Sequence, residues 1–195
     1  MSEGIGALPP SLAAESPAPP AASARRGTFF EISLVVFLAL FIALILKVYV
    51  AEAYEIRGKS MMKTFDDGER VMMLKVLYEI NRGDIIIFPC PHSSQKDLIK
   101  RVIGLPGDHV EVRNGVVFIN GTKLEEPYLG PLDADGHAHM VHEYRRKDVP
   151  PGKYYVLGDN RPASQDSRVF DVIDGSCIKG KVICRWWPIE RFTSF

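Results

Sequence analysis

The sequence predicts a mainly β domain that follows a single transmembrane helix. Two observations support this fold class. A run of 15 uncharged, largely aliphatic residues fills positions 32–46. After it, short apolar or alternating segments are separated by Gly, Pro, Asn and Asp, a pattern typical of strands and turns. The sequence after position 51 shows no long apolar repeat at helical spacing, so we expect strands to build the globular part.

Residues 1–27 have the composition of a disordered tail. This segment holds 5 Pro, 7 Ala and 4 Ser, and its charged residues are Glu3, Glu15, Arg25 and Arg26. Paired prolines interrupt a regular helix, and few side chains here are large and apolar enough to form a core. We therefore expect a flexible tether before the apolar run.

Residues 28–51 have the composition of a membrane anchor. With its flanking aromatic and aliphatic residues, the apolar stretch covers 23 positions, 29–51, interrupted by Glu31 and Lys47 near its ends. A helix needs roughly 20 residues to cross about 30 Å of hydrocarbon, and charged side chains near the ends can reach the interface. A buried helix in a soluble protein would need a large core on all sides, which favours the anchor.

A cleavable signal peptide is the second interpretation of this segment. Arg25 and Arg26 would form its positive region, and Ala51-Glu52-Ala53 matches the small-residue cleavage pattern A-x-A. Both interpretations carry the C-terminal part across a membrane. Charge alone does not decide the orientation, because basic residues flank both ends and long domains cross membranes largely regardless of charge.

Residues 52–195 form the globular part, and their charges are balanced. The segment has 144 residues with 21 basic and 21 acidic side chains, which is long enough for a sizeable core. The whole chain has 24 of each sign and 46% hydrophobic residues. A zero net charge argues against a general nucleic-acid binder, and the apolar content argues against a wholly disordered chain.

The strand predictions in this part rest on short apolar runs and on turn residues. Asn114-Gly115 lies between two alternating segments, which is a strong signal for a two-residue hairpin, and a second Asn-Gly follows at 120–121. The polar segment 133–147 is expected to be an exposed loop. The predicted strands are 71–74, 84–88, 98–103, 110–113, 116–119, 153–157 and 181–187.

Cysteine and histidine give weak signals for a site. Cys90, Cys177 and Cys184 have no local signature of a cysteine enzyme, and the spacing of the last two permits a disulfide without demanding one. His137, His139 and His142 lie close together beside two aspartates. A metal site there would need fixed ligands, so a solvated polar loop is the favoured interpretation.

Ser60 and Lys100 are candidates for nucleophilic catalysis. Lys100 lies in an apolar strand, and alternation puts it on the same face as Leu98 and Val102. If that face is buried, the pKa of the lysine falls, and its neutral amine could take the proton of a serine hydroxyl. Spacing alone favours the simpler interpretation, in which Ser60 is a turn residue and Lys100 extends to solvent from a half-buried strand.

Six segments in order resemble the bacterial type I signal peptidases, the membrane-anchored serine proteases that remove signal peptides from exported proteins. The most specific strings are Lys-Arg-x-x-Gly-x-Pro-Gly-Asp, starting at Lys100, and Gly-Asp-Asn-Arg-x-x-Ser-x-Asp-Ser-Arg, starting at Gly158. The six segments are the apolar span, 59–64, 82–88, 100–108, 158–168 and 185–188. The resemblance implies a signal-peptidase-like β domain.

The resemblance also implies roles for individual residues. The Ser60 backbone N–H would form part of the oxyanion hole, and no metal or cofactor would be required. Met61 and Met62 would shape shallow pockets for small substrate side chains. The implied site residues are Ser60 as nucleophile, Lys100 as general base, Ser164 as the hydroxyl that orients Lys100, Asp159 as the partner of Arg101, and Asp166 with Arg168 as a structural ion pair.

Two positions depart from the family pattern. Gly58 stands where many relatives have a hydroxyl residue, although other members also have glycine, and Lys63 stands where the family usually has proline. The Gly58 departure leaves the oxyanion hole more dependent on main-chain donors. The Lys63 departure removes a rigid residue from the loop that carries Ser60.

The implied partners are preproteins with A-x-A signal peptides and the lipid bilayer, with no nucleic acid. The implied location is the bacterial inner (plasma) membrane, with one pass and with residues 52–195 on the periplasmic side as the catalytic domain. Other interpretations remain open. A related Ser/Lys protease could process pilins or conjugation proteins, and an inactive membrane-anchored binding module could keep the same sequence motifs.

Overall fold

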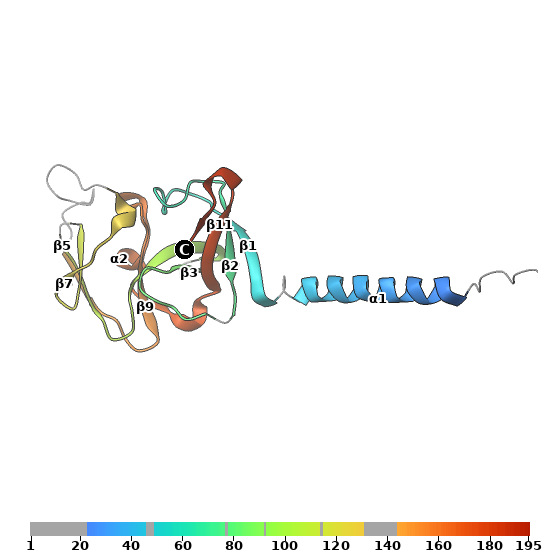
Figure 1. The fold of residues 1–195 in the computed structure, drawn as a ribbon. Helices are drawn as coiled ribbons and strands as arrows, with labels where there is room; N and C mark the ends of the chain where they lie inside the picture. Colours follow the sequence, from blue (N-terminus) through green and yellow to red (C-terminus); the bar gives the residue numbers. More distant parts are fainter. Residues whose placement is uncertain (1–22, 46–48, 77, 92, 114, 131–143) are drawn as a thin grey trace, which may run out of the picture. The chain divides into compact units, whose positions relative to one another are not determined.

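The computed structural model describes residues 23–45, 49–76, 78–91, 93–113, 115–130 and 144–195 (Figure 1). The chain divides into two compact units, Met1–Ile42 and Ala43–Phe195. Residues 1–22 of the predicted tail lie outside the described residues, as do the histidines at 137, 139 and 142.

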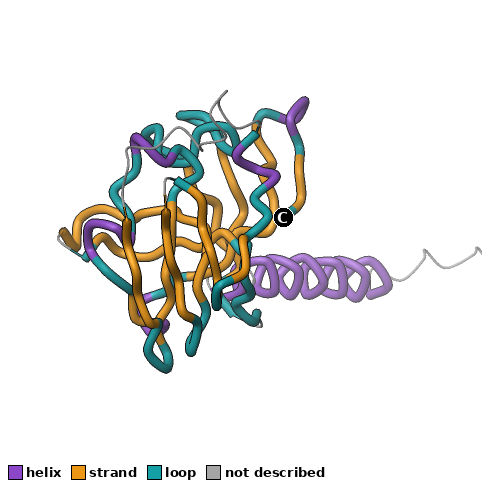
Figure 2. Tube along the Cα trace, turned by 90° about the vertical axis from the view of Figure 1, so that its left-hand side faces the viewer, coloured by secondary structure: helices purple, strands orange, loops and turns teal. Residues whose placement is uncertain are grey.

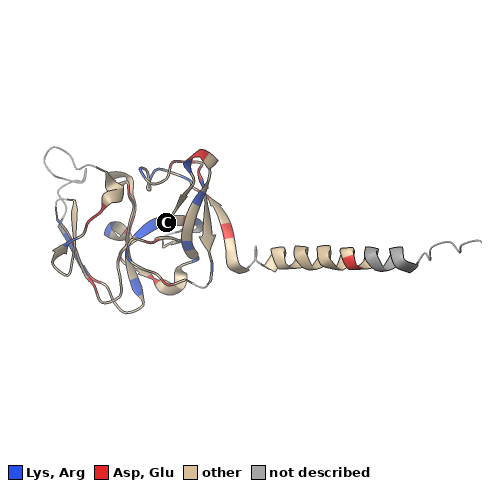
Figure 3. Cartoon of the chain, in the orientation of Figure 1, with Lys and Arg blue, Asp and Glu red and all other residues tan. Residues whose placement is uncertain are grey.

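Helix α1 spans Ser23–Ile45. It begins before the predicted start at residue 28, because the last proline of the tail is Pro20 and the following Ala and Arg residues favour a helix. From position 29 to 45 its side chains are exposed, and Glu31 is the one charged residue among them (Figure 3). Among the described residues, no helix is long and apolar enough to cross a membrane.

Two antiparallel sheets build the globular unit (Figures 1 and 2). The larger sheet has the strand order β1-β2-β11-β3-β4-β9-β10, with β12 paired to β11, and the smaller has the order β7-β6-β5-β8. The strands of the larger sheet are β1 (Ala51–Glu55), β2 (Arg70–Leu74), β3 (Ile85–Cys90), β4 (Ser93–Gly104), β9 (Lys153–Leu157), β10 (Ile173–Asp174), β11 (Gly180–Trp187) and β12 (Thr193–Ser194).

The smaller sheet and the short helices complete the fold. The strands are β5 (His109–Arg113), β6 (Val116–Ile119), β7 (Thr122–Lys123) and β8 (Tyr144–Asp148). The helices are α2 (Ser167–Phe170) and the 3-10 turns η2 (Pro127–Leu129), η3 (Arg161–Ala163), η4 (Gly175–Cys177) and η5 (Ile189–Arg191). Each predicted strand is thus confirmed, including the pair β5–β6 that flanks the Asn114-Gly115 turn, although Asn114 itself lies outside the described residues.

The prediction of a loop over 133–147 is wrong at its C-terminal end. Residues from 144 onward form β8, which pairs with β5 along its whole length. β8 lies at the edge of the smaller sheet and its described side chains are largely exposed, so its Arg and Lys residues remain in solvent. Charged edge strands of this kind are common because they discourage pairing with other chains. Residues 133–143 lie outside the described part.

The core lies on both faces of the central strands. Residues 85–88 of β3 are all buried, and β4 buries both Lys100 and Arg101, although their side chains point to opposite faces. One core cluster fills the space between β1, β2, β3 and β11, and includes Ile56, Met61 and Phe65. The charged groups of Lys100 and Arg101 therefore have little access to water, and this sets the chemistry of the site.

Candidate active site

Lys100 and Ser60 are in direct contact. Lys100 lies in the middle of β4 with 1% of its surface exposed. Ser60 is half-buried in the turn that follows β1. The Lys100 Nζ donates to Ser60 Oγ at 2.8 Å and to the carbonyl oxygen of Ile99 at 2.8 Å. The fold thus joins the two residues that the sequence analysis singled out for nucleophilic catalysis.

Burial lowers the pKa of Lys100 from 10.5 to about 8. The main cause is loss of hydration around the ammonium group, which disfavours its charged form. The carboxylates of Asp166 and Asp159 act in the opposite direction and raise the pKa, but they do not cancel the burial effect. With such a pKa, roughly one Lys100 side chain in ten is neutral at pH 7 and able to accept a proton.

A groove of about 710 Å³ opens beside this pair, between β1 and β4. Among the described strands, β1 is an edge strand that pairs only with β2, and β9 pairs with β4 only from Arg101 onward. Two strand edges therefore border the groove, with Ser60 and Lys100 among its lining residues. The lining residues are 52–58, Ser60, Ile87 and 96–100.

The walls of the groove are mostly apolar near Ser60. Ile56, Ile87 and Ile99 line it, and Tyr54 donates a hydrogen bond across it to Asp97 Oδ2 at 3.2 Å. None of these four residues was predicted to belong to the site, although the alternation over 53–57 places Tyr54 and Ile56 on one face. The lining residues do not include Met61 or Met62. Met61 is 1% exposed inside the core cluster and Met62 lies at the surface, so the pockets predicted for these two side chains are not part of this groove.

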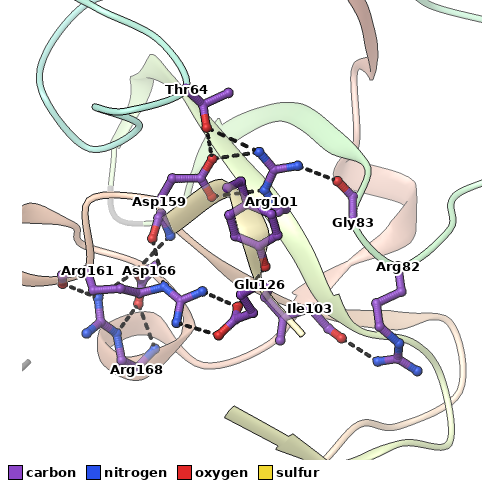
Figure 4. Close-up of polar contacts among 12 residues, drawn as sticks. Thr64, Arg82, Gly83, Arg101, Ile103, Glu126, Asp159, Arg161, Asp166 and Arg168 are labelled. Atoms are coloured by element: carbon purple, nitrogen blue, oxygen red, sulfur yellow. Dashed lines mark hydrogen bonds and ion pairs between the residues drawn. The ribbon is translucent and has the colours of Figure 1, made fainter. Parts of the chain in front are cut away.

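Arg101 and Asp159 form a buried ion pair next to the groove (Figure 4). The Arg101 Nε and Nη2 donate to the two carboxylate oxygens at 2.9 and 2.7 Å. Thr64, in the loop after Ser60, donates its hydroxyl to the same carboxylate, and the Arg101 guanidinium lies over the Tyr128 ring at 3.9 Å. This network joins β4, the end of β9 and the loop that carries Ser60, as the resemblance implied for Arg101 and Asp159.

Asp166 and Arg168 form a second ion pair (Figure 4). The Arg168 Nε and Nη2 donate to Asp166 at 2.7 and 2.8 Å, and the backbone N–H of Gly158 donates to Asp166 Oδ2 at 3.0 Å. The backbone at Gly158 has no room for a side chain, because a Cβ there would lie 2.5 Å from the Ser60 carbonyl oxygen. The Asp166–Arg168 pair therefore fixes the residue after β9, Gly158, which lies in close contact with the backbone of Ser60.

Ser164 lies beside Gly158 but makes no hydrogen bond to Lys100. Its Oγ is buried and has no hydrogen-bond partner among the described residues. It lies over Gly158, where an added Cβ would be 2.2 Å away. The predicted bond from Ser164 to the lysine is thus absent here, since the Lys100 Nζ is directed to Ser60 and to the carbonyl of Ile99.

The two departures from the family pattern have distinct local geometry. Gly58 has φ +93° and donates its N–H to Asp67 Oδ1 at 2.6 Å. Lys63 has φ 86°, which is unusual for a residue other than glycine, and its Nζ donates to the carbonyl of Leu129. Proline cannot adopt this φ, because its ring holds φ near −65°. The conformation of the loop that carries Ser60 is therefore one that proline at position 63 could not adopt.

The cysteines form no disulfide, and the histidines at 137, 139 and 142 lie outside the described residues. Cys90, Cys177 and Cys184 are free thiols. Within the part of the chain that the structure describes, no group of three or more His, Cys, Asp or Glu is arranged to hold a metal ion. The chemistry that the arrangement supports is proton transfer between a buried amine and a serine hydroxyl at the border of an extended groove.

Sequence comparisons relate this chain to known signal peptidases. A profile of the family described as "Signal peptidase, peptidase S26" matches residues 29–187. Signal peptidase I of Bacillus caldolyticus is 40% identical over 167 residues, covering 80% of this chain and 90% of that protein. Signal peptidase IB of Staphylococcus aureus (strain COL) is 40% identical over 159 residues, covering 74% and 82%. A crystal structure of a signal peptidase I from Enterococcus faecalis V583 matches with 35% identity and a TM-score of 0.47, over 54% of this chain and 98% of that chain.

Proposed function

The chain belongs to the peptidase S26 family of signal peptidases and is a serine peptidase, and we propose that it cleaves signal peptides from preproteins with Ser60 as nucleophile and Lys100 as general base. The observation that carries the proposal is the 2.8 Å contact between the Lys100 Nζ and Ser60 Oγ. A buried lysine next to a serine hydroxyl can activate that hydroxyl as a nucleophile, because burial favours the neutral amine that accepts its proton.

The proposed reaction has two steps. Neutral Lys100 takes the Ser60 hydroxyl proton while Oγ attacks the substrate carbonyl, and the Lys100 ammonium then gives a proton to the leaving amine. The Ser60 N–H stabilises the negative charge on the tetrahedral intermediate. In the second step Lys100 removes a proton from water and the resulting hydroxide attacks the acyl carbon. The bond from that carbon to Ser60 Oγ then breaks as the Lys100 ammonium returns a proton to Oγ, and the signal peptide leaves with a free carboxylate. Lys100 and Ser60 end in their starting states.

The groove favours an extended substrate with small side chains. The edges of β1 and β4 offer backbone groups to a peptide strand added between them, which is a common mode of peptide binding. Branched side chains at Ile56 and Ile99 limit the depth of the groove near Ser60. In an extended peptide, alternate residues point the same way, so small residues at the last and third-last positions of the signal peptide fit an A-x-A rule.

The apolar segment 28–51 is proposed to be a single-pass anchor in a bacterial plasma membrane, with the catalytic unit on the periplasmic side. In its support, α1 continues without a break to Ile45, and its side chains from position 29 are nearly all apolar. A cut after Ala53 would remove part of β1, which pairs with β2 and borders the groove. Anchoring would raise the effective concentration of substrates whose signal peptides end at the bilayer surface.

The test is cleavage of a purified preprotein by the full chain and by two variants, Ser60→Ala and Lys100→Ala. Both variants should lose cleavage, because one lacks the nucleophile and the other lacks the base. Ser176→Ala and Lys153→Ala change the same residue types at exposed or half-exposed positions near β10 and should retain activity. Full activity in a folded Ser60→Ala or Lys100→Ala variant would contradict the mechanism. Varying the two small residues of the substrate tests the A-x-A rule separately.

A further inference from the structure

We propose that Asn160 is a positioning residue for the oxyanion hole, because its side-chain amide fixes the peptide group whose N–H belongs to Ser60. The inference rests on the proposed function, since it assumes that Ser60 is the nucleophile and that its N–H faces the developing negative charge. Asn160 itself would not contact the substrate. It would act through the backbone of Lys59 and Ser60.

Asn160 makes two hydrogen bonds to the Ser60 turn. Its Nδ2 donates to the carbonyl oxygen of Lys59 at 2.9 Å, and its backbone N–H donates to the carbonyl oxygen of Ser60 at 3.0 Å. One residue thus holds the peptide groups before and after Ser60. Both contacts bridge a large sequence distance, since residue 160 comes from the segment after β9 and residue 60 from the turn after β1.

The contact with Lys59 bears directly on the Ser60 N–H. The Lys59 carbonyl and the Ser60 N–H belong to the same peptide group, which is planar and trans, so the two bonds point in opposite directions. Fixing the carbonyl therefore fixes the direction of the N–H. A hydrogen bond at the carbonyl also polarises the peptide group and strengthens its N–H as a donor.

Asn160 is itself held in a rigid frame. Its neighbour Asp159 is bound by Arg101, and the N–H of Gly158 is bound by Asp166. On the other side, Arg161 donates its Nε to the Gly158 carbonyl at 3.1 Å and pairs with Glu126 (Figure 4). Ion pairs therefore flank Asn160 on both sides. A donor on such a frame can orient a loop peptide without moving itself.

The Lys59 carbonyl also accepts from the Met62 N–H at 3.2 Å within the turn, and the Asn160 amide adds a donor from outside the turn, next to a chain segment that contains glycine. Gly58 adopts φ +93°, a conformation that glycine reaches easily and leaves easily. It also brings no hydroxyl that could serve as a second oxyanion donor. The catalytic hole then depends on main-chain donors, and the orientation of the Lys59–Ser60 peptide becomes more important to the rate.

The test compares Asn160→Ala with the unchanged full chain in steady-state cleavage of a preprotein. Removing an oxyanion donor outright costs about 100- to 1000-fold in kcat, so loss of its orientation should cost roughly 10- to 100-fold, with KM changed less than about 3-fold. The acid limb of the pH profile should not move, because Lys100 is untouched. Asn160→Asp has the same size but places a carboxylate against the Lys59 carbonyl, and should be slower still.

A second readout separates positioning from a merely structural role. A peptide aldehyde with an A-x-A sequence forms a tetrahedral adduct with Ser60, so its affinity should fall in parallel with kcat/KM in the Asn160 variants. Binding of the uncleaved substrate to a Ser60→Ala background should stay constant. The matched control is Asn120→Ala, at the β6–β7 turn of the smaller sheet, which should change none of these values.

Three results would overturn the inference. These are an unchanged kcat in Asn160→Ala, a loss that appears in KM alone, and an aldehyde affinity that does not follow kcat/KM. Thermal unfolding of each variant checks that the fold is retained, and Asn160→Ser, which keeps a small polar side chain, replaces the alanine variant if that variant is unstable. Failure of the proposed function is distinguishable, because in that case Ser60→Ala itself would cleave.

Discussion

Replacing Lys100 by methionine should abolish cleavage without lowering the stability of the fold at pH 7. Methionine is unbranched, apolar and of similar length, so it can fill the same space in β4. Because the pKa of Lys100 falls from 10.5 to about 8 on folding, its charged form lowers the stability of the folded protein. At about 1.4 kcal/mol for each pKa unit, the cost of the charged form is roughly 3 kcal/mol.

The loss of two hydrogen bonds offsets part of this gain. Lys100 donates to Ser60 and to the Ile99 carbonyl, and each bond contributes about 1 kcal/mol. The free energy of unfolding of Lys100→Met at pH 7 should therefore equal that of the original chain or exceed it by up to about 2 kcal/mol. Urea unfolding followed by the fluorescence of Trp186 and Trp187, both in β11, measures this difference.

The stability difference between the original chain and Lys100→Met should depend on pH. The Lys100 pKa is near 10.5 in the unfolded chain and about 8 in the folded one, so unfolding takes up a proton between these values. Raising the pH from 8 to 10.5 should therefore stabilise the original chain relative to Lys100→Met, by about 3 kcal/mol in all. A variant that is less stable by more than about 2 kcal/mol at pH 7, by an amount that stays the same at pH 10, would refute the reasoning.

Two further substitutions test the loop that carries Ser60 and the network behind it. Asp159→Ala leaves Arg101 buried without its carboxylate, so the free energy of unfolding should fall by about 3–5 kcal/mol in the same urea assay. A loss below about 1 kcal/mol would contradict the structural role of this ion pair. Lys63→Pro should lower the free energy of unfolding by more than about 1 kcal/mol because proline cannot adopt φ 86°, whereas Lys63→Gly should be tolerated. A proline variant as stable as the original chain would show that the loop has another conformation.

The strands were predictable because their signals are local. The alternation in 110–113 and 116–119 and the Asn-Gly dipeptide between them specify a hairpin over about ten residues. β8 was missed because an exposed edge strand needs no apolar face, so its charged sequence looks like a loop. Its pairing with β5 is a tertiary contact that leaves no mark on the local sequence.

The site was predictable in its identity but less so in its contacts. The burial of Lys100 follows from its apolar neighbours, while its pairing with Ser60 came from the family resemblance, because spacing alone does not bring two distant residues together. The place of Met61 in the core depends on its packing with residues from other strands, such as Val71 and Val182, which the local sequence does not specify. Asn160 was quoted within a motif without a role, because its bonds go to backbone carbonyls and any residue can provide a carbonyl.

The pH profile of kcat/KM for preprotein cleavage tests the central claim most directly. Cleavage requires neutral Lys100, so the rate should rise with pH and level off above an apparent pKa of about 8, the value set by burial of this lysine. The full chain should be measured from pH 6 to pH 10 at constant ionic strength, with folding checked at each end. A rate that is flat across this range, or one that levels off near pH 6.5 as expected for a histidine base, would contradict Lys100 as the general base.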